Sequence, residues 1–112
     1  MQNCYGICTT GYGISGYNAL NCSGSSTSAH GIDVYTAQDC SGNSVNSIGL
    51  YAYNLATSCF GQSANSTGLY AYNAAFCVGN VYQGTAIQAV IATGCVASQG
   101  GTNNITYKYN MP

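Results

Sequence analysis

The sequence predicts an all-β fold, a single-stranded parallel β-helix (β-solenoid) of about six coils with 18–19 residues each. Three observations support this. A cysteine recurs at intervals of 18, 18, 19, 18 and 18 residues, apolar and polar residues alternate within each copy, and Ser, Asn and Gly fill the segments between. We expect one solenoid domain over residues 1–112, with coils at 4–21, 22–39, 40–58, 59–76, 77–94 and 95–112.

Columns of like residues at fixed distances from each cysteine define the repeat. We expect two of them to form the core ladder, together with glycine or Ala97 two residues after each cysteine. A mostly alanine column, two residues after the aliphatic one, is also expected inside: Gly16, Val34, Ala52, Ala71, Ala89 and Tyr107. The extra residue of the third copy is expected near 55–58, where a turn could absorb it. The two core columns are Cys4, Cys22, Cys40, Cys59, Cys77 and Cys95, and Ile14, Ile32, Leu50, Leu69, Ile87 and Ile105.

Each copy alternates with a period of two residues, which indicates a strand with one buried face. Leu69 and Ala71 would face one way, and Tyr70 and Tyr72 the other. A second short strand is expected to run through each cysteine. A unit this short cannot bury its apolar side chains alone, so successive units must stack. At a spacing of about 4.8 Å, six rungs give a rod on the order of 30 Å long.

Other repeat folds fit less well. A left-handed hexapeptide helix also has coils of 18 residues but needs an aliphatic residue every six, and the positions six and twelve after Ile32 are Gln38 and Ser44. The calcium-binding nonapeptide repeat needs more aspartates than the two in this chain. Leucine-rich repeats need several leucines per unit. These alternatives are therefore disfavoured.

The run GLYAYNAAFCVG at 68–79 and its sister copies resemble the Gly/Tyr/Cys-rich coils of right-handed β-helix (pectate-lyase-like) repeat proteins. The resemblance covers essentially the whole chain. It implies a right-handed coil. It does not imply an activity, because this architecture carries many functions.

Only three side chains are formally charged, Asp33, Asp39 and Lys108. Neutralising phosphates needs several Lys or Arg, so we expect no nucleic-acid binding. The longest apolar stretch, 86–92, is too short to span a membrane as a helix. A net charge of −1 leaves little long-range repulsion between copies, which favours self-association.

Acid–base chemistry has few candidates: His30, Asp33 and Asp39, with Lys108 far away in the last copy. Pectate-lyase-like catalysis would need clustered acidic residues and a base, and a glycosidase would need two carboxylates across a sugar. We interpret these residues as solvated surface groups. The sequence therefore predicts no enzyme, no catalytic residue and no cofactor.

The cysteines are interpreted as small buried hydrophobes, with Cys8 outside the column. A linear row does not supply four converging ligands, so no metal site is expected. Disulfides between neighbouring rungs remain sterically conceivable. Glycosylation patterns at Asn21, Asn65 and Asn104 are weak signals in a chain rich in Asn, Ser and Thr.

Tyrosines are expected to form an exposed strip along the rod. Two interpretations stay open: stacking that stabilises adjacent rungs by up to about 1 kcal/mol per pair, or a contact surface for a partner or sugar. Ice binding is disfavoured, because the outward columns are not arrays of threonine. The strip comprises Tyr17, Tyr35, Tyr53 and Tyr72 in one column, with Tyr51 and Tyr70 two residues earlier.

The ends of the rod lead to the functional hypothesis. The first copy starts almost at Met1 without an evident cap, and Lys108 and Pro112 lie in the last copy. Either the chain is a segment of a longer β-helix, or copies stack end to end. We therefore expect a structural, non-catalytic solenoid in an extracellular or cell-surface fibre or stalk, partnered by itself or by adjoining coils. The alternative is a carbohydrate-binding or carbohydrate-processing β-helix whose tyrosine strip holds a glycan.

Overall fold

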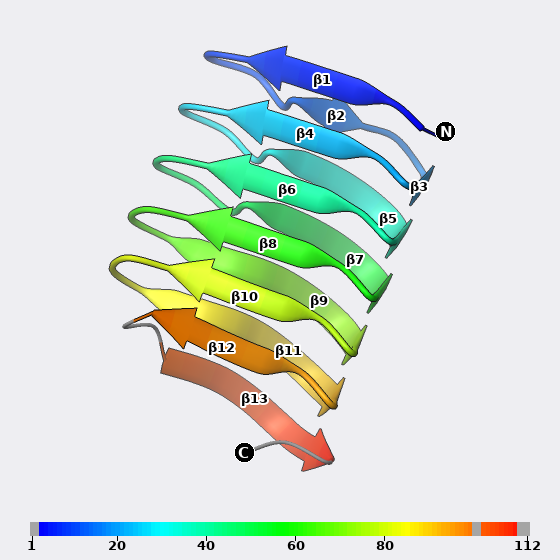
Figure 1. Cartoon of the computed structure of the whole chain (residues 1–112), viewed down its shortest axis with the longest axis vertical. Helices are drawn as coiled ribbons and strands as arrows, with labels where there is room; N and C mark the ends of the chain where they lie inside the picture. The colour runs from blue at the N-terminus through cyan, green and yellow to red at the C-terminus, as the bar shows by residue number, and fades with distance from the viewer. Residues whose placement is uncertain (1–2, 100–101, 110–112) are drawn as a thin grey trace.

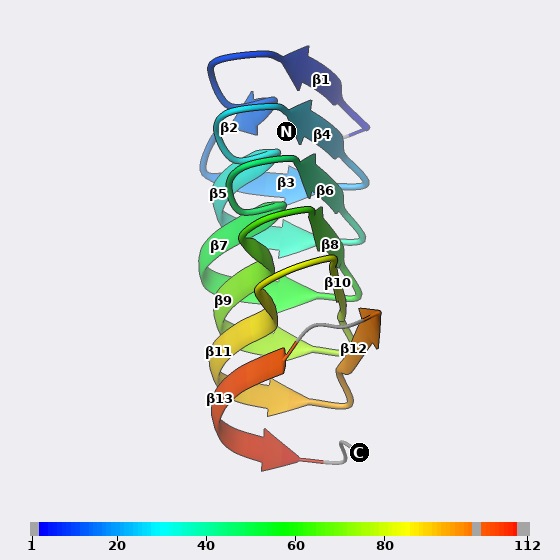
Figure 2. The ribbon, with the colours of Figure 1, turned by 90° about the vertical axis from the view of Figure 1, so that its left-hand side faces the viewer.

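The computed structural model describes the backbone of residues 3–99 and 102–109 and the side-chain environments of residues 3–97. Within that part all regular structure is β, and the chain winds as a parallel β-solenoid (Figures 1 and 2). It completes about five full turns between the first and last short strands. The predicted fold class is confirmed, and the longest dimension is 33 Å. The right-handed turn implied by the resemblance stays a prediction.

Two sheets form the walls of the solenoid, and all their strand pairs are parallel. The short sheet contains β1 (Tyr5–Cys8), β4 (Ser23–Ser26), β6 (Ser41–Ser44), β8 (Phe60–Ser63), β10 (Val78–Val81) and β12 (Val96–Gln99). The long sheet contains β2 (Ile14–Ser15), β3 (Asn18–Leu20), β5 (Ile32–Gln38), β7 (Leu50–Thr57), β9 (Thr67–Ala75), β11 (Thr85–Thr93) and β13 (Thr102–Tyr109). None of the described residues forms a helix that could cross a membrane.

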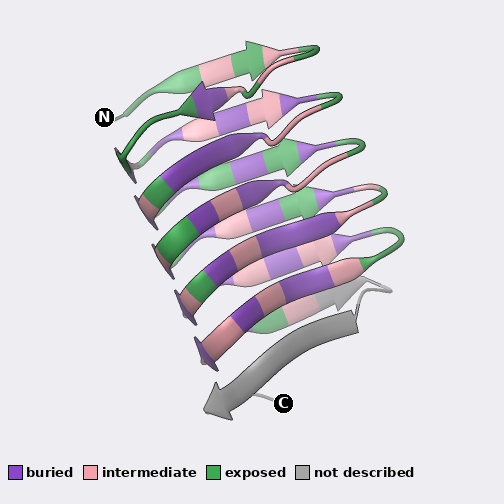
Figure 3. Cartoon of the chain, turned by 180° about the vertical axis from the view of Figure 1, so that it is seen from behind, coloured by how far each residue is buried: buried purple, intermediate pink, exposed green. Residues whose placement is uncertain are grey.

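The core is a narrow stack of columns between the two sheets, visible as alternating buried positions in Figure 3. The aliphatic column and most of the cysteine column are buried, and so are Val34, Ala52, Ala71 and Ala89 of the expected alanine column. A second alanine column, which the sequence analysis did not single out, is buried as well. Small residues dominate because the walls touch: a Cβ on Gly49 would lie 2.2 Å from the carbonyl oxygen of Gln62. The buried members are Ile14, Ile32, Leu50, Leu69 and Ile87; Cys22, Cys40, Cys59, Cys77 and Cys95; and Ala19, Ala37, Ala56, Ala74 and Ala92.

Two members of the expected core ladder differ. Cys4 is exposed, because within the described chain its coil has a neighbour on one side only. Ile105 does not continue the aliphatic column: β13 pairs Ile105 with Ala89, and Asn103 with Ile87. The register of β13 against β11 shifts between Thr85 and Ile87. The side chain of Ile105 lies outside the described part.

The short strands also begin later than expected. The sequence analysis ran each of them through a cysteine, but β6 begins at Ser41, one residue after Cys40. Cys40 therefore lies at the corner, with its side chain buried between the ends of the two sheets.

The extra residue of the third coil lies inside a strand, not in the turn expected at 55–58. Ala52 pairs with Val34 and Leu55 with Thr36, so Tyr53 and Asn54 together oppose a single residue of β5. This is a β-bulge, which bends a strand and redirects its side chains.

Cys8 belongs to a serine column. It pairs with Ser26, and its Sγ accepts a hydrogen bond from the N–H of Gly11 at 3.2 Å. Ser26 accepts equivalently from the N–H of Ala29 at 3.2 Å. The serines also donate to carbonyl oxygens at 2.6 Å and so close each turn. Cys8 is thus a turn residue, and the remaining members of the column are Ser44 and Ser63.

The residue before each cysteine of the cysteine column adopts a left-handed backbone conformation, with φ between 53° and 62° from Asn3 to Gly94. Asn and Gly tolerate this conformation, whereas an aromatic residue is strained there. Phe76 occupies the fifth such corner with φ 54°, and its ring covers Gly94.

Replacing Phe76 by asparagine should raise the free energy of unfolding by about 0.5–1 kcal/mol, because the left-handed strain is relieved. The reciprocal change Asn21→Phe, at an equivalent exposed corner, should lower it by a similar amount. Urea unfolding of both variants checks this. A destabilised F76N would mean that the ring packed on Gly94 outweighs the strain.

Candidate functional site

A column of four aromatic rings runs along the outer face of the long sheet. Tyr12 stacks on His30, His30 on Tyr51, and Tyr51 on Tyr70, with centroid separations of 5.3, 5.2 and 4.6 Å and interplanar angles of 7–14°. Tyr12 and His30 precede β2 and β5, whereas the other two lie in β7 and β9. The sequence analysis missed this aromatic column, because its members occupy two different repeat positions.

The expected column of exposed tyrosines is interrupted. Tyr17 and Tyr35 stack at 5.0 Å and 11°. Tyr53 does not continue the stack: it lies in the bulge of β7, and its ring meets Tyr51 edge-on at 4.6 Å and 78°. The bulge therefore separates the Tyr17–Tyr35 pair from Tyr72.

Tyr53 is held by a carboxylate. Its hydroxyl donates a hydrogen bond to Asp33, and this bond, with burial and the negative charge, raises the pKa of Tyr53 to about 12. Asp33 is only 6% exposed, so the interpretation of this residue as a solvated surface group is wrong. The phenol donor offsets part of the cost of burying a carboxylate. Asp39, in contrast, is exposed at a corner.

His30 is held by hydrogen bonds at Nδ1 and lies near a carboxylate at Nε2. Its Nδ1 accepts hydrogen bonds from the N–H of Ile48 at 3.3 Å and from Ser47 Oγ at 2.7 Å, and its Nε2 lies 4.0 Å from Asp33 Oδ2. A backbone N–H can only donate, so Nδ1 is unprotonated and the neutral ring carries its proton on Nε2. The hydroxyl, imidazole and carboxylate follow the order of a catalytic relay. Tyr12 and Tyr51 stack on the ring, and Nδ1 also accepts from the backbone, so these contacts fix its orientation.

The free energy of unfolding should decrease as the pH falls below about 6.5, the ordinary pKa of histidine. Burial lowers the pKa of folded His30, and the raising effect of the Asp33 charge only partly opposes it. The unfolded chain then binds a proton more readily than the folded one. The contribution of His30 to the free energy of unfolding is therefore complete above the pKa that His30 has in the unfolded chain. It is lost as the pH falls through the lower pKa that His30 has in the folded chain. Urea unfolding at a series of pH values measures this slope.

The control for this prediction is His30→Phe, which keeps a stacked ring and removes the titration. His30 is the only histidine, so the slope between about pH 7 and 5 should disappear in this variant. A slope that persists in H30F would assign the pH dependence to other groups.

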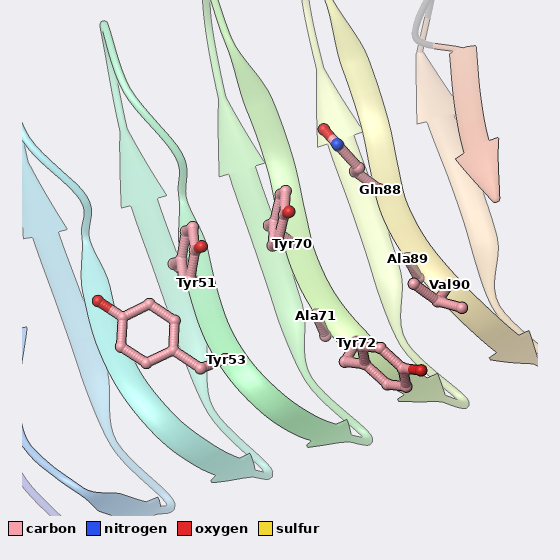
Figure 4. A pocket seen from close by; sticks show the side chains of 8 residues that line it. All are labelled: Tyr51, Tyr53, Tyr70, Ala71, Tyr72, Gln88, Ala89 and Val90. Atoms are coloured by element: carbon pink, nitrogen blue, oxygen red, sulfur yellow. The ribbon is translucent and has the colours of Figure 1, made fainter. Parts of the chain in front are cut away.

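A groove lies beside the aromatic column and crosses three coils (Figure 4). One wall carries Tyr51, Tyr70 and Gln88, which pair across β7, β9 and β11. Tyr53 and Tyr72, each 52% exposed, form the other wall with Val90. The hollow has a volume of about 460 Å³. We call it the tyrosine groove; its lining residues are Tyr51, Tyr53, Tyr70, Ala71, Tyr72, Gln88, Ala89 and Val90.

A second hollow of about 280 Å³ lies over the short sheet. Asn43, Gln62 and Asn80 pair across β6, β8 and β10 and form a row of amides beside Tyr82. The Oδ1 atom of Asn80 is buried and has no hydrogen-bond partner among the described residues. The sequence analysis missed this row, although the amides recur three residues after successive cysteines.

The cysteine column is a row of thiols that donate to backbone carbonyls. Cys40 Sγ donates to Gln38 O at 3.2 Å, and Cys59 repeats the bond to Thr57 O at 3.2 Å. The neighbouring thiols of Cys40 and Cys77, together with burial, raise the pKa of Cys59. The part of the chain that the structure describes holds no group of three or more His, Cys, Asp or Glu that could bind a metal ion. These contacts favour a packing role for the column.

The geometry defines the chain as a parallel β-solenoid with aromatic and amide rows on its outer faces. Comparison with protein-family models, with curated proteins and with solved structures finds no match in any of the three. The functional argument therefore rests on the described residues themselves.

Proposed function

We propose that the chain is a structural, non-catalytic β-solenoid that forms or belongs to an extracellular fibre or surface stalk. In this proposal its coils stack on adjoining coils, either of another copy or of a longer chain, and it is related to the right-handed, pectate-lyase-like Gly/Tyr/Cys-rich repeats. One observation supports it above all: the register of the short sheet is kept residue for residue, from Tyr5 opposite Ser23 to Val78 opposite Val96. Each coil is therefore a template for the next.

The backbone of β1 supports addition of a further coil. The carbonyl oxygens of Cys4 and Cys8 accept from the N–H groups of Ser23 and Thr27. Since hydrogen-bonding groups alternate in direction along a parallel strand, the N–H of Ile7 points away from β4. An edge of this kind recruits another strand. The net charge of −1 adds little repulsion.

Electron microscopy and light scattering over a range of protein concentrations test the proposal. Filaments a few nanometres wide and a growing mass would support it. Ile7→Pro should reduce assembly, because it removes the outward N–H while leaving the bonds to β4 intact. Ile7→Ser removes the same apolar side chain but keeps the N–H, and should assemble normally.

The assembly of copies would be contradicted by a monomer that persists at every concentration. The longer-chain form has its own test, a fusion that joins two copies in register at a coil boundary. The fusion should unfold in one transition at a higher temperature than the single copy, because coils stabilise their neighbours. Two independent transitions would contradict it.

A second candidate function is carbohydrate binding in the tyrosine groove. Exposed faces of Tyr53 and Tyr72, phenol hydroxyls and the Gln88 amide offer both apolar and hydrogen-bonding contacts to a neutral sugar. Retention on a glycan array, lost in Tyr53→Ala and Tyr72→Ala, would support this function. Tyr82→Ala is the matched control, since Tyr82 is 77% exposed and lies outside the groove. We expect no turnover of polysaccharides, and robust activity would contradict the non-catalytic assignment.

A further inference from the structure

The tyrosines of this chain differ in how they face one another. Tyr17 and Tyr35 lie on adjacent coils, exposed by 69% and 40%, with nearly parallel rings. The Tyr35 N–H donates to the Tyr17 carbonyl oxygen at 2.9 Å, so the two backbones are fixed side by side. Tyr5 and Tyr82 are exposed as well, yet neither has a ring contact among the described side chains.

We propose that Tyr17 and Tyr35 are a site of oxidative cross-linking, at which dityrosine covalently joins the first coil to the second. The oxidant is a peroxide used by a peroxidase. Each phenol loses one electron and one proton, and the two radicals couple through the ring carbons next to the hydroxyl-bearing carbon. The hydrogens on those carbons move to the oxygens as aromaticity returns. In total two electrons and two protons leave, and they reduce one peroxide to two waters.

The geometry favours coupling within one molecule. The rings are 5.0 Å apart at 11°, and the N–H groups of Tyr35 and Thr36 both donate to the carbonyl oxygen of Tyr17, so ring edges meet after small side-chain rotations. Holding two reacting groups together replaces a bimolecular encounter by a far more probable intramolecular one. The exposure of both rings also lets a peroxidase reach them.

Other tyrosine pairs rank below this one. Tyr51 and Tyr70 are stacked at 4.6 Å and 7°, but they are half-buried, and burial together with the neighbouring Tyr70 raises the pKa of Tyr51. Tyr53 meets Tyr51 at 78° and donates its hydroxyl to Asp33. This edge-on pair is not stacked, and we rank it below the two stacked pairs. We therefore expect the yield to follow stacking and exposure together, with Tyr17–Tyr35 first and Tyr51–Tyr70 second.

The experiment uses the full chain with its accessible thiols alkylated, at low concentration, as an equal mixture of isotopically light and heavy protein. Peroxidase and hydrogen peroxide are added, and the digested products are analysed by mass spectrometry and dityrosine fluorescence. The expected main product joins Tyr17 to Tyr35 within one isotopic form and is lighter by two hydrogen atoms. Tyr35→Phe should abolish it, and Tyr17→Phe should do the same. Tyr5→Phe and Tyr82→Phe should leave its yield unchanged.

Three results would overturn the site: cross-links distributed by exposure alone, with Tyr5 and Tyr82 used as often; products that mainly mix light and heavy chains; or an unchanged yield of the cross-link at Tyr17 in Tyr35→Phe. Circular dichroism of the variants shows whether they keep the fold, and the phenylalanine retains the ring. A single copy contains the whole site, so a chain that stays monomeric would contradict filament assembly and still form this cross-link. The cross-linked chain should melt at a higher temperature, because the bond constrains the unfolded state.

Discussion

Gly49→Ala should lower the free energy of unfolding by about 3 kcal/mol or more, at the upper end of what overpacking costs. A Cβ at this position would lie 2.2, 2.5 and 2.7 Å from the backbone O, N and C atoms of Gln62 in β8. These are atoms of the opposite sheet, and parallel pairing to β6 and β10 holds them in place. The short sheet cannot move away from position 49 without breaking the hydrogen bonds between its strands. Equilibrium unfolding in urea measures the loss.

Gly68→Ala, one coil further along the same column, is the matched control. Its Cβ would lie 2.8–2.9 Å from backbone atoms of Asn80 and Ala86. The walls are less close here, and the next coil carries Ala86 at this position, so we expect a loss of about 1–2 kcal/mol. Equal losses in the two variants would show that the contact of the walls at Gly49 does not limit stability.

The closeness of the walls also decides where function can lie. With Gly49 against Gln62 and the aliphatic column fully buried, the interior of these coils is filled by the chain itself. A ligand or partner must therefore use an outer face or the edge of a terminal coil. The tyrosine groove, the amide row and the edge of β1 are such places.

The repeat period predicted the fold because residues that are one period apart in the sequence occupy equivalent positions on successive coils of a solenoid, where they stack in columns. The location of the extra residue in coil three could also have been predicted from the sequence, although the sequence analysis placed it wrongly. An insertion after Leu55 would have put leucine into the column held elsewhere by alanine. The bulge at 53–54 instead places Ala56 in that column and leaves Leu55 half-buried. The narrow interior of the coil accommodates alanine better than leucine at this position, which favours the bulge at 53–54 over an insertion after Leu55.

The candidate site was less predictable, because it depends on side-chain directions. Periodicity assigned Tyr53 to a stack with Tyr35, but the bulge turned it toward Tyr51 and Asp33. Asp33 faces outward, as the alternation predicts, yet it is buried because aromatic rings from neighbouring coils cover that face. Isolated acidic residues are usually solvated, and only the positions of the surrounding rings reverse this expectation.

Leu69→Ala should cost about 3–5 kcal/mol, the upper range for a buried leucine. Leu69 is fully buried in the aliphatic column between Leu50 and Ile87. The cavity would be lined by backbone that strand pairing fixes, so it cannot collapse. Guanidinium unfolding followed by circular dichroism measures the loss.

Leu55→Ala removes the same atoms from a half-buried position and should cost less than about 1 kcal/mol, since Thr36 and Asn73 occupy the paired positions. Equal costs would contradict the assignment of the aliphatic column as the main source of stability.

The position of Leu69 in the fourth of the repeated coils allows a second test with the Leu69→Ala variant. In a linear stack each coil contacts only its neighbours, so a weakened inner coil should broaden the transition or divide it in two. A transition that shifts without broadening would show that the coils of this rod unfold together.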